Sequence, residues 1–248
     1  MHIELIGCTS AGKSSLSQRV IQKYNQDEVQ IITSYDFVLD WARFGWVKNH
    51  KARMAILNLA ALFACLMTWR NNRSLFRLIA EIILRLPKRV GITEKLKIAR
   101  IAARNIGIYE IVRRYCKPYQ IVLADEGTLH IASYLFVHVA QAPDMSRLQA
   151  FLRLVSLPDA VVYLRQSKSV LVDRTLQRGH KRIPGGSPEF AGIFIQHNLS
   201  VLEALAADPK VTDRLLIHCN GDILPLAAEQ HHNPRLAAIR KIFAASLL

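Results

Sequence analysis

The sequence predicts an α/β fold in which short buried strands alternate with helices. Three observations lead to this prediction. An apolar strand at residues 3–6 runs directly into a glycine-rich loop and then into an amphipathic helix that extends to about Tyr24. Four later segments have the short, apolar composition of strands: residues 29–33, 119–124, 158–164 and 214–219. The chain of 248 residues is long enough for a single domain, 1–248, with a large buried core.

The glycine-rich loop matches the phosphate-binding motif G-x-x-x-x-G-K-[ST] at every required position, from Gly7 to Ser14. Its glycines let the backbone wrap an anion, so that N–H groups point inward beside the positive end of a helix. We expect Lys13 to reach the β- and γ-phosphates of ATP, and the Ser14 hydroxyl to coordinate Mg²⁺. The predicted nucleotide-binding residues of this loop are Gly7, Ser10, Ala11, Gly12, Lys13, Ser14 and Ser15. A chance glycine-rich turn is the alternative, but strand, loop and helix occur here in the order that the motif requires.

A carboxylate, Asp36, follows the second strand. In P-loop kinases the end of this strand faces the acceptor, so Asp36 is the first candidate for a general base that takes a hydroxyl proton. The alternative role for Asp36 is the N-cap of a helix that starts at Phe37, and one residue can serve in both roles.

Positive charge is concentrated in residues 41–117, which we call the basic segment. This segment contains 17 Lys and Arg against three Asp and Glu, whereas the rest of the chain contains 16 of each kind. The formal net charge of +14 therefore belongs to the basic segment, which also contains Trp41, Trp46 and Trp69. We expect it to be a helical insertion.

Residues 54–69 of the basic segment are almost all apolar and lie between Arg53 and Arg70. A helix of this length would span about 24 Å, less than the ~30 Å hydrocarbon thickness of a bilayer. We favour a buried core or dimer-interface helix, then a helix lying on a membrane surface, and last a true membrane span.

Two more basic helices are expected after it. Residues 73–86 place four polar side chains on one stripe at strict four-residue spacing: Arg73, Arg77, Glu81 and Arg85. A longer helix runs from Thr93, its predicted N-cap, to Cys116. One face of that helix carries Lys97, Arg100 and Arg104.

Two acids, Asp125 and Glu126, end the third strand, where a carboxylate can hold Mg²⁺ directly or through water. Adjacent strand residues point to opposite sides, so we expect one of them to face the metal and favour Asp125. The predicted metal ligands are therefore Ser14 and Asp125, and either acid of this pair could instead be the general base.

A helix at residues 169–178 and the Pro/Gly-rich loop after it predict a lid at about 174–187. Arg174 and Arg178 lie four apart on this helix, and Lys181 and Arg182 continue the basic run. A closing lid would deliver guanidinium groups onto the phosphates, so Arg174 and Arg178 join Lys13 and Asp36 as catalytic candidates. The alternative is a solvated basic turn.

Cysteine usage and the chain start favour a cytoplasmic protein. The four cysteines are scattered without a C-x-x-C pair, and the first strand starts at His2 with no secretory leader before it. The basic segment also allows a peripheral position at the inner face of the membrane.

These motifs together resemble the P-loop kinases of the thymidylate kinase and deoxynucleoside kinase type. The shared pieces are GCTSAGKSS, Asp36, LADEG, PDAVVYL, the R-x-x-x-R-G sequence from Arg174 to Gly179, and CNGD. The resemblance covers residues 1–40 and 119–225. It implies a P-loop NTPase fold with a parallel five-stranded sheet in the order 2-3-1-4-5 and helices on both faces. It also places the stretch from Asn220 to Asp222 near the adenine of ATP, with Asn220 as the predicted contact.

The resemblance has two departures. Those kinases carry an arginine directly after the strand-end acid, and Glu126 stands in that place here. The helices of the basic segment also match no nucleotide-acceptor pocket.

The leading hypothesis is therefore a Mg²⁺- and ATP-dependent kinase for a non-nucleotide hydroxyl acceptor: a sugar, a glycan or a lipid-linked intermediate. The first alternative is a nucleoside or nucleotide kinase. The second is an ATP-binding switch that docks on an anionic membrane or, less favoured, on nucleic acid. No N-K-x-D or L-S-G-G-Q-like sequence supports a GTPase or an ABC-type ATPase. A homodimer is expected, with the basic segment in contact with anionic membrane as a further partner.

Overall fold

The sheet has six strands in the order β2-β3-β1-β4-β5-β6. The computed structural model describes residues 1–24, 30–87, 90–219, 222–225 and 234–245. The strands are β1 (His2–Gly7), β2 (Gln30–Thr33), β3 (Gln120–Ala124), β4 (Ala160–Arg165), β5 (Leu215–Cys219) and β6 (Asp222–Pro225). The first five are parallel, which confirms the predicted order 2-3-1-4-5. The antiparallel β6 is not among the predicted strands, because four residues after a turn signal carry too little pattern to be recognised.

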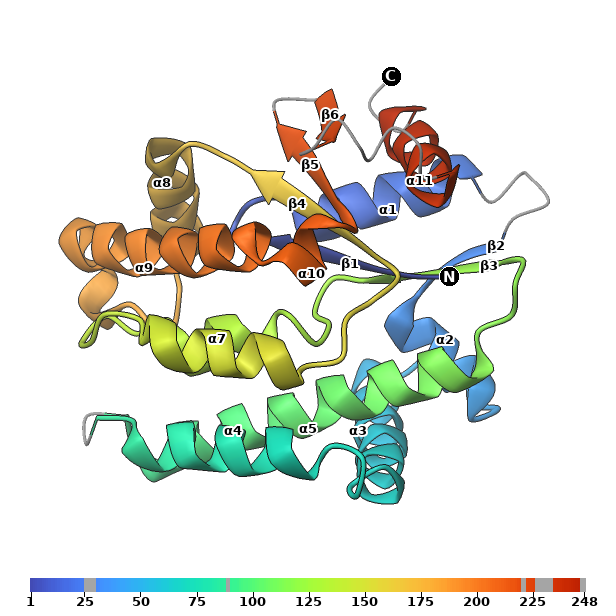
Figure 1. The fold of residues 1–248 in the computed structure, drawn as a ribbon, viewed down its shortest axis with the longest axis horizontal. Coiled ribbons are helices and arrows are strands. Elements are labelled where there is room, and N and C mark those ends of the chain that lie inside the picture. Colours follow the sequence, from blue (N-terminus) through green and yellow to red (C-terminus); the bar gives the residue numbers. More distant parts are fainter. Residues whose placement is uncertain (25–29, 88–89, 220–221, 226–233, 246–248) are drawn as a thin grey trace.

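β1 lies at the centre of the sheet, between β3 and β4, and all six of its residues are buried. A parallel sheet covered on both faces explains why its strands are nearly continuous apolar runs. Helices α1 (Lys13–Tyr24) and α11 (Pro234–Ala245) lie on one side of the sheet, and α5 (Ile92–Tyr115) and α7 (Met145–Leu154) on the other (Figure 1). The remaining helices are α2 (Ser34–Trp41), α3 (His50–Met67), α4 (Arg73–Arg85), α6 (Ile131–Phe136), α8 (Lys168–Arg178), α9 (Pro188–Ala207) and α10 (Pro209–Thr212), with a 3-10 turn, η1, at Pro184–Gly186.

The basic segment forms an outer layer on α5. Figure 1 shows α4 and α3 on the side of α5 that faces away from the sheet. A small second core of buried residues joins α2, α3, α5 and β3, and includes Phe37, Leu57, Ala61 and Ile108. α3 approaches α5 very closely: a Cβ added to Gly107 would lie 1.8 Å from the carbonyl oxygen of Ala61. Only glycine allows this approach, so Gly107 sets the distance between the two helices.

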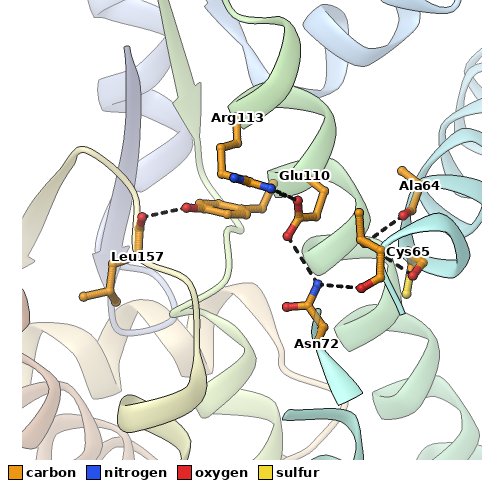
Figure 2. Close-up of polar contacts among 8 residues, drawn as sticks. Ala64, Cys65, Asn72, Glu110, Arg113 and Leu157 are labelled. Atoms are coloured by element: carbon orange, nitrogen blue, oxygen red, sulfur yellow. Dashed lines mark hydrogen bonds and ion pairs between the residues drawn. The ribbon is translucent and has the colours of Figure 1, made fainter. Parts of the chain in front are cut away.

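A buried polar network fixes the corner between α3 and α4 (Figure 2). Glu110 of α5 accepts a hydrogen bond from Asn72 Nδ2 at 3.2 Å and pairs with Arg113 at 2.7 Å. The same Asn72 amide donates to the carbonyl oxygen of Thr68, whose hydroxyl donates to the carbonyl oxygen of Ala64 at 2.8 Å. A buried carboxylate is tolerated when it is paired and hydrogen-bonded. Rotation of α3 about its axis would break this network.

The helices of the basic segment agree with the prediction in part. α4 exposes the predicted stripe from Arg73 to Arg85 and buries Leu75, Ile79, Ile82 and Ile83, as its pattern predicts. The N-cap of α5 is Gly91, so Thr93 is not the cap: it lies inside the first turn. Nothing in the local sequence distinguishes these two starting points.

A buried-core position for residues 54–69 is wrong. Leu59, Phe63 and Leu66 of α3 point outward and are at least 60% exposed. Among the described residues, two helices are long and apolar enough to cross a membrane, α3 with a mean hydropathy of 1.3 and α9 with 1.2. The buried share of their residues is 17% for α3 and 44% for α9. Of these two apolar helices, α3 is therefore the one that leaves most of its apolar surface exposed.

Candidate active site

The phosphate-binding loop connects β1 to α1 as its motif predicts. Gly12 has a φ of 96° and Ser10 a φ of 61°, both in the left-handed region. A Cβ on Gly7 would lie 3.1 Å from the carbonyl oxygen of Leu164 and 3.4 Å from Ala11 Cβ. The glycines thus serve two different needs: Gly12 supplies a backbone conformation, and Gly7 lets β4 pass close to the loop.

Lys13 is the first residue of α1, and its ammonium lies over the loop. Nζ donates to the carbonyl oxygens of Gly7 at 2.8 Å and Cys8 at 3.2 Å. Burial lowers the pKa of Lys13, and the nearby carboxylates of Asp125 and Glu126 act in the opposite direction. The strand-end acids therefore lie close enough to the loop lysine to influence its charge.

A cavity of about 670 Å³ opens beside the loop. Its size falls within the range of small-molecule sites. Residues of the loop, the end of β3, α5, α6, α9 and the segment after α8 all contribute to it. Besides loop residues 9–15, the lining consists of Lys97, Asp125, Glu126, His130, Ser133, Tyr134, Arg178, Gly179, His180, Lys181, Arg182, Phe194 and Asn198.

Both strand-end acids line this cavity, but their surroundings differ. Asp125 Oδ1 is buried and has no hydrogen-bond partner. Glu126 is engaged: its Oε2 lies 2.7 Å from Arg104 Nη2 and 3.4 Å from the hydroxyl of Tyr35. An unpartnered buried oxygen is costly, so Asp125 is the acid of this pair with an oxygen available to a partner from outside the protein.

The residues at this point fit Mg²⁺. Ser14 and Asp125 both line the cavity and offer hard oxygen ligands, and Mg²⁺ is usually held by one or two such ligands together with substrate phosphates. Across the described part of the chain, no group of three or more His, Cys, Asp or Glu side chains could hold a metal ion on its own. A metal here would therefore depend on the nucleotide for its remaining ligands.

Arg104 is a site residue that the sequence does not reveal. It belongs to the predicted basic face of α5, yet its side chain is only 12% exposed and reaches Glu126. Its guanidinium also lies over the ring of Tyr35, 5.4 Å from the centroid. The resemblance leads us to expect an arginine directly after the strand-end acid. Here a guanidinium reaches the side of Glu126 from α5 instead.

Asp36 lies outside the residues that line the cavity. It is in the first turn of α2, whose N-cap is Thr33, so the N-cap role predicted for Asp36 is wrong. Its backbone N–H donates to Thr33 Oγ1 at 3.0 Å, and Thr33 Oγ1 donates back to Asp36 Oδ2 at 2.7 Å. This reciprocal pair resembles a capping box. Arg53 forms an ion pair with the other carboxylate oxygen.

The two arginines of α8 lie in different places. Arg178 lines the cavity, together with Gly179 and Lys181 from the following loop, whereas Arg174 is exposed and is not among the lining residues. Thr175 of the same helix brings its hydroxyl to 3.4 Å from Ser10 Oγ, so α8 touches the phosphate-binding loop.

Arg182 anchors the predicted lid to the body of the protein. It donates to the carbonyl oxygen of Ser133 at 3.2 Å and to that of Val137. Its guanidinium lies over the rings of Tyr134 and Phe194, at 5.7 and 5.5 Å from the centroids. These contacts place Arg182 between α6 and α9, so the basic run of this loop is only partly directed at the cavity.

Glu4 organises the loop that follows β3. This fully buried carboxyl accepts hydrogen bonds from the backbone N–H groups of Leu129 at 3.2 Å and His130 at 2.9 Å. Burial raises the pKa of Glu4 to about 7, although these N–H groups favour its ionised form. A Cβ on Gly127 would lie 2.4 Å from the Glu4 carboxyl carbon, so this loop residue must remain small.

Glu4 thus positions His130 in the cavity wall. Burial lowers the pKa of His130 to about 4, and the charge of Lys13 acts in the same direction. The only signal for Glu4 in the sequence is one acid inside an otherwise apolar strand. The remaining predicted nucleotide contact, Asn220, lies outside the described residues.

Comparisons with known proteins give matches in structure only. No protein-family model and no curated protein matches the sequence. Three solved structures of a deoxyadenosine kinase from M. mycoides are similar in fold. The one with dCMP and dCDP has a TM-score of 0.45 and 15% identity and covers 99% of this chain and 100% of that chain. The one with dATP has a TM-score of 0.44 and 13% identity, covering 88% and 91%, and the one with dCTP has 0.41 and 12%, covering 97% and 100%. These kinases are of the group that the motifs resemble, but with TM-scores below 0.5 the likeness carries no argument about function.

Proposed function

We propose that this protein is an ATP-dependent phosphotransferase that moves the γ-phosphoryl group to a small acceptor bound in the 670 Å³ cavity. The observation that carries the proposal is the meeting of three groups in that cavity. They are a complete phosphate-binding loop, the half-buried ammonium of Lys13, and the unpartnered buried oxygen of Asp125. Phosphoryl transfer depends mainly on positioning and charge stabilisation, which these groups provide.

Each group has a separate proposed role. Lys13 and the loop amides bind the β- and γ-phosphates, and Arg178 and Lys181 add positive charge from the other side. Mg²⁺, held by Ser14 and Asp125, would neutralise charge on the transferring phosphoryl group. Glu126 is the carboxylate that already lines the cavity and is the nearer candidate for the base. Asp36 does not line the cavity, so it is a proposed base only for an acceptor whose hydroxyl extends from the cavity towards the start of α2.

A nucleoside or nucleotide is the acceptor that the cavity favours. Tyr134, Phe194 and His130 supply aromatic surface beside the cations of Lys97 and Lys181. This combination suits a planar base joined to hydroxyl or phosphate groups. The size of the cavity also suits a small molecule rather than a polymer.

A lipid- or glycan-linked acceptor is the second candidate. The observation in its favour is the exposed apolar face of α3. The protein thus carries both a phosphate-binding loop and an exposed apolar surface. Such an acceptor would bring its reactive end into the cavity while its remainder stayed outside.

A coupled assay of ADP release tests the proposal. Purified protein with ATP and Mg²⁺ would be offered deoxynucleosides, nucleoside monophosphates, sugars and short-chain lipid-linked sugars in turn, and mass analysis would identify any product. Lys13→Ala should abolish release with every acceptor, because it removes the charge aimed at the transferring phosphoryl group. Unchanged turnover in that variant would contradict the assignment of the phosphate-binding loop. A product formed only with the lipid-linked acceptors would show that the acceptor is not a nucleoside or nucleotide.

A further inference from the structure

α3 has its small side chains inside and its large apolar side chains outside. The face that meets α5 is made of Leu57, Ala61 and Cys65, and two of these three are small. The outward face carries large apolar side chains that are 47–69% exposed: Leu59, Leu62, Phe63, Leu66 and Met67. A core helix of a soluble protein has the opposite arrangement. An exposed apolar patch of this kind marks a contact surface.

Two features hold this face outward. Gly107 allows α5 to approach the backbone of Ala61 so closely that no larger side chain could be accommodated between the helices. The buried contact of Asn72 with Glu110, just after the end of α3, prevents the helix from rotating about its axis (Figure 2). The large apolar side chains therefore cannot turn inward without losing both contacts.

Cations and tryptophans lie at both ends of this apolar face. Arg43, Lys48 and Lys51 are exposed before or at the start of α3, and Arg70 and Arg73 are exposed after its end. Trp46 near the first end is 75% exposed and Trp69 at the second is 48% exposed. Lys51 lies eight residues before Leu59, which places it roughly 80° around the helix, at the edge of the apolar face. From residue 41 to residue 80 the sequence contains no Asp or Glu.

We propose that α3 lies flat on an anionic lipid surface, with its apolar face in the interface and its flanking cations on the lipid headgroups. Lys and Arg attract anionic headgroups, Trp prefers the interfacial region, and large apolar side chains enter the boundary of the acyl chains. All three requirements are met within one segment of 31 residues, 43–73.

A second copy of this chain fits the same surface poorly. Two α3 helices packed antiparallel would place Lys51 of one against Arg70 of the other, and a parallel pair would oppose equal charges. No acid between residues 41 and 80 could relieve this repulsion. Lipid with acidic headgroups supplies the missing negative charge.

The helix is suited to lie on the membrane rather than to cross it. Its 18 residues cover about 27 Å, slightly less than the hydrocarbon thickness of a bilayer. One side of it is also packed on α5, whose exposed charges would have to enter the bilayer with it.

Vesicle sedimentation of the full chain tests this proposal. We expect the protein to pellet with vesicles of phosphatidylcholine and phosphatidylserine at low salt, to remain in the supernatant with phosphatidylcholine alone, and to dissociate as salt rises. Arg70→Gln and Arg73→Gln should each weaken binding about fivefold. Phe63→Asp should abolish it, and circular dichroism would verify that this exposed position leaves the fold intact.

Matched controls separate this site from general attraction of a basic protein. Arg19 of α1 and Lys210 of α10 are exposed cations remote in sequence from α3, and their change to Gln should leave binding within twofold. Binding that falls equally in all four charge variants would overturn the role of α3, as would binding that survives Phe63→Asp. A protein that stays in the supernatant with both vesicles, or a dimer that Phe63→Asp converts to a monomer, would also overturn the proposal. Lys13→Ala should bind vesicles like the unchanged chain, so the test is independent of the proposed activity.

Discussion

Glu4 should make the stability of this protein depend on pH between about 4.5 and 7. The folded state raises its pKa from 4.5 to about 7, so within this window the folded state binds a proton that the unfolded state has released. Stability from this group is complete below pH 4.5, falls as pH rises, and is lost above about pH 7. The difference between the two pKa values corresponds to about 3 kcal/mol in the free energy of unfolding.

Three histidines act in the opposite direction over nearly the same range. Burial lowers the pKa of His2, His130 and His138 to about 4. Each of them stabilises the folded state above pH 6.5, and that stability is lost as pH falls towards 4. The pH profile of the unchanged protein is therefore a sum of opposing contributions and does not isolate Glu4.

The contribution of Glu4 is isolated by the difference in unfolding free energy between the unchanged protein and the Glu4→Gln variant. Glutamine keeps the shape and one acceptor for the loop N–H groups but cannot ionise. Urea denaturation of both proteins at pH 5, 6, 7 and 8 should give a difference in unfolding free energy that changes by about 2.5 kcal/mol across the series, in favour of the variant at high pH. Glu203→Gln, at an exposed position, measures the effect of the same substitution on the surface. A Glu4→Gln difference that is constant with pH would refute the reasoning.

Three further substitutions test the site and the outer layer. Asp36→Asn should slow phosphoryl transfer roughly 10²–10⁴-fold with nucleotide affinity unchanged, as expected for a general base; lost stability with normal transfer would make its pair with Arg53 purely structural. Asp125→Asn should raise the Mg²⁺ concentration needed for half-maximal rate, seen in a magnesium titration, and an unchanged titration would remove it from the metal site. Gly107→Ala should destabilise the protein by about 3 kcal/mol or more in urea denaturation, because the new Cβ meets the backbone at Ala61 and neither side can yield; a cost below about 1 kcal/mol would show that α3 is not held as tightly as described.

The sheet and the phosphate-binding loop are the parts that the sequence predicts well. Their signals are local: an apolar strand, a glycine at each required position, and a helix that starts at Lys13. The strand order follows from the resemblance to P-loop kinases, which those local motifs reveal. Such features depend on residues that are neighbours along the chain, and so they can be recognised without tertiary information.

The cavity wall is harder to predict because its residues meet only after folding. Arg104 and Lys97 share a face of α5 in the sequence, yet the first is buried against Glu126. Arg182 looks like part of a solvated loop, and its carbonyl and aromatic partners come from α6 and α9. The outward direction of α3 depends on Gly107, a residue about 46 positions away along the chain from Ala61. Periodicity identifies the helix but does not state which face is buried.

The two edges of the sheet bear on how this chain could aggregate. An exposed edge strand is a template on which another chain can add a strand. Here one edge is β2, only four residues or about 13 Å long, which ends at the cap residue of α2. The other is the equally short β6, which ends in Pro225, a residue without an amide hydrogen to donate. Strand addition therefore has little backbone to use at either edge, and any precipitation of the native protein should be relieved by polar substitutions on α3 rather than on the sheet.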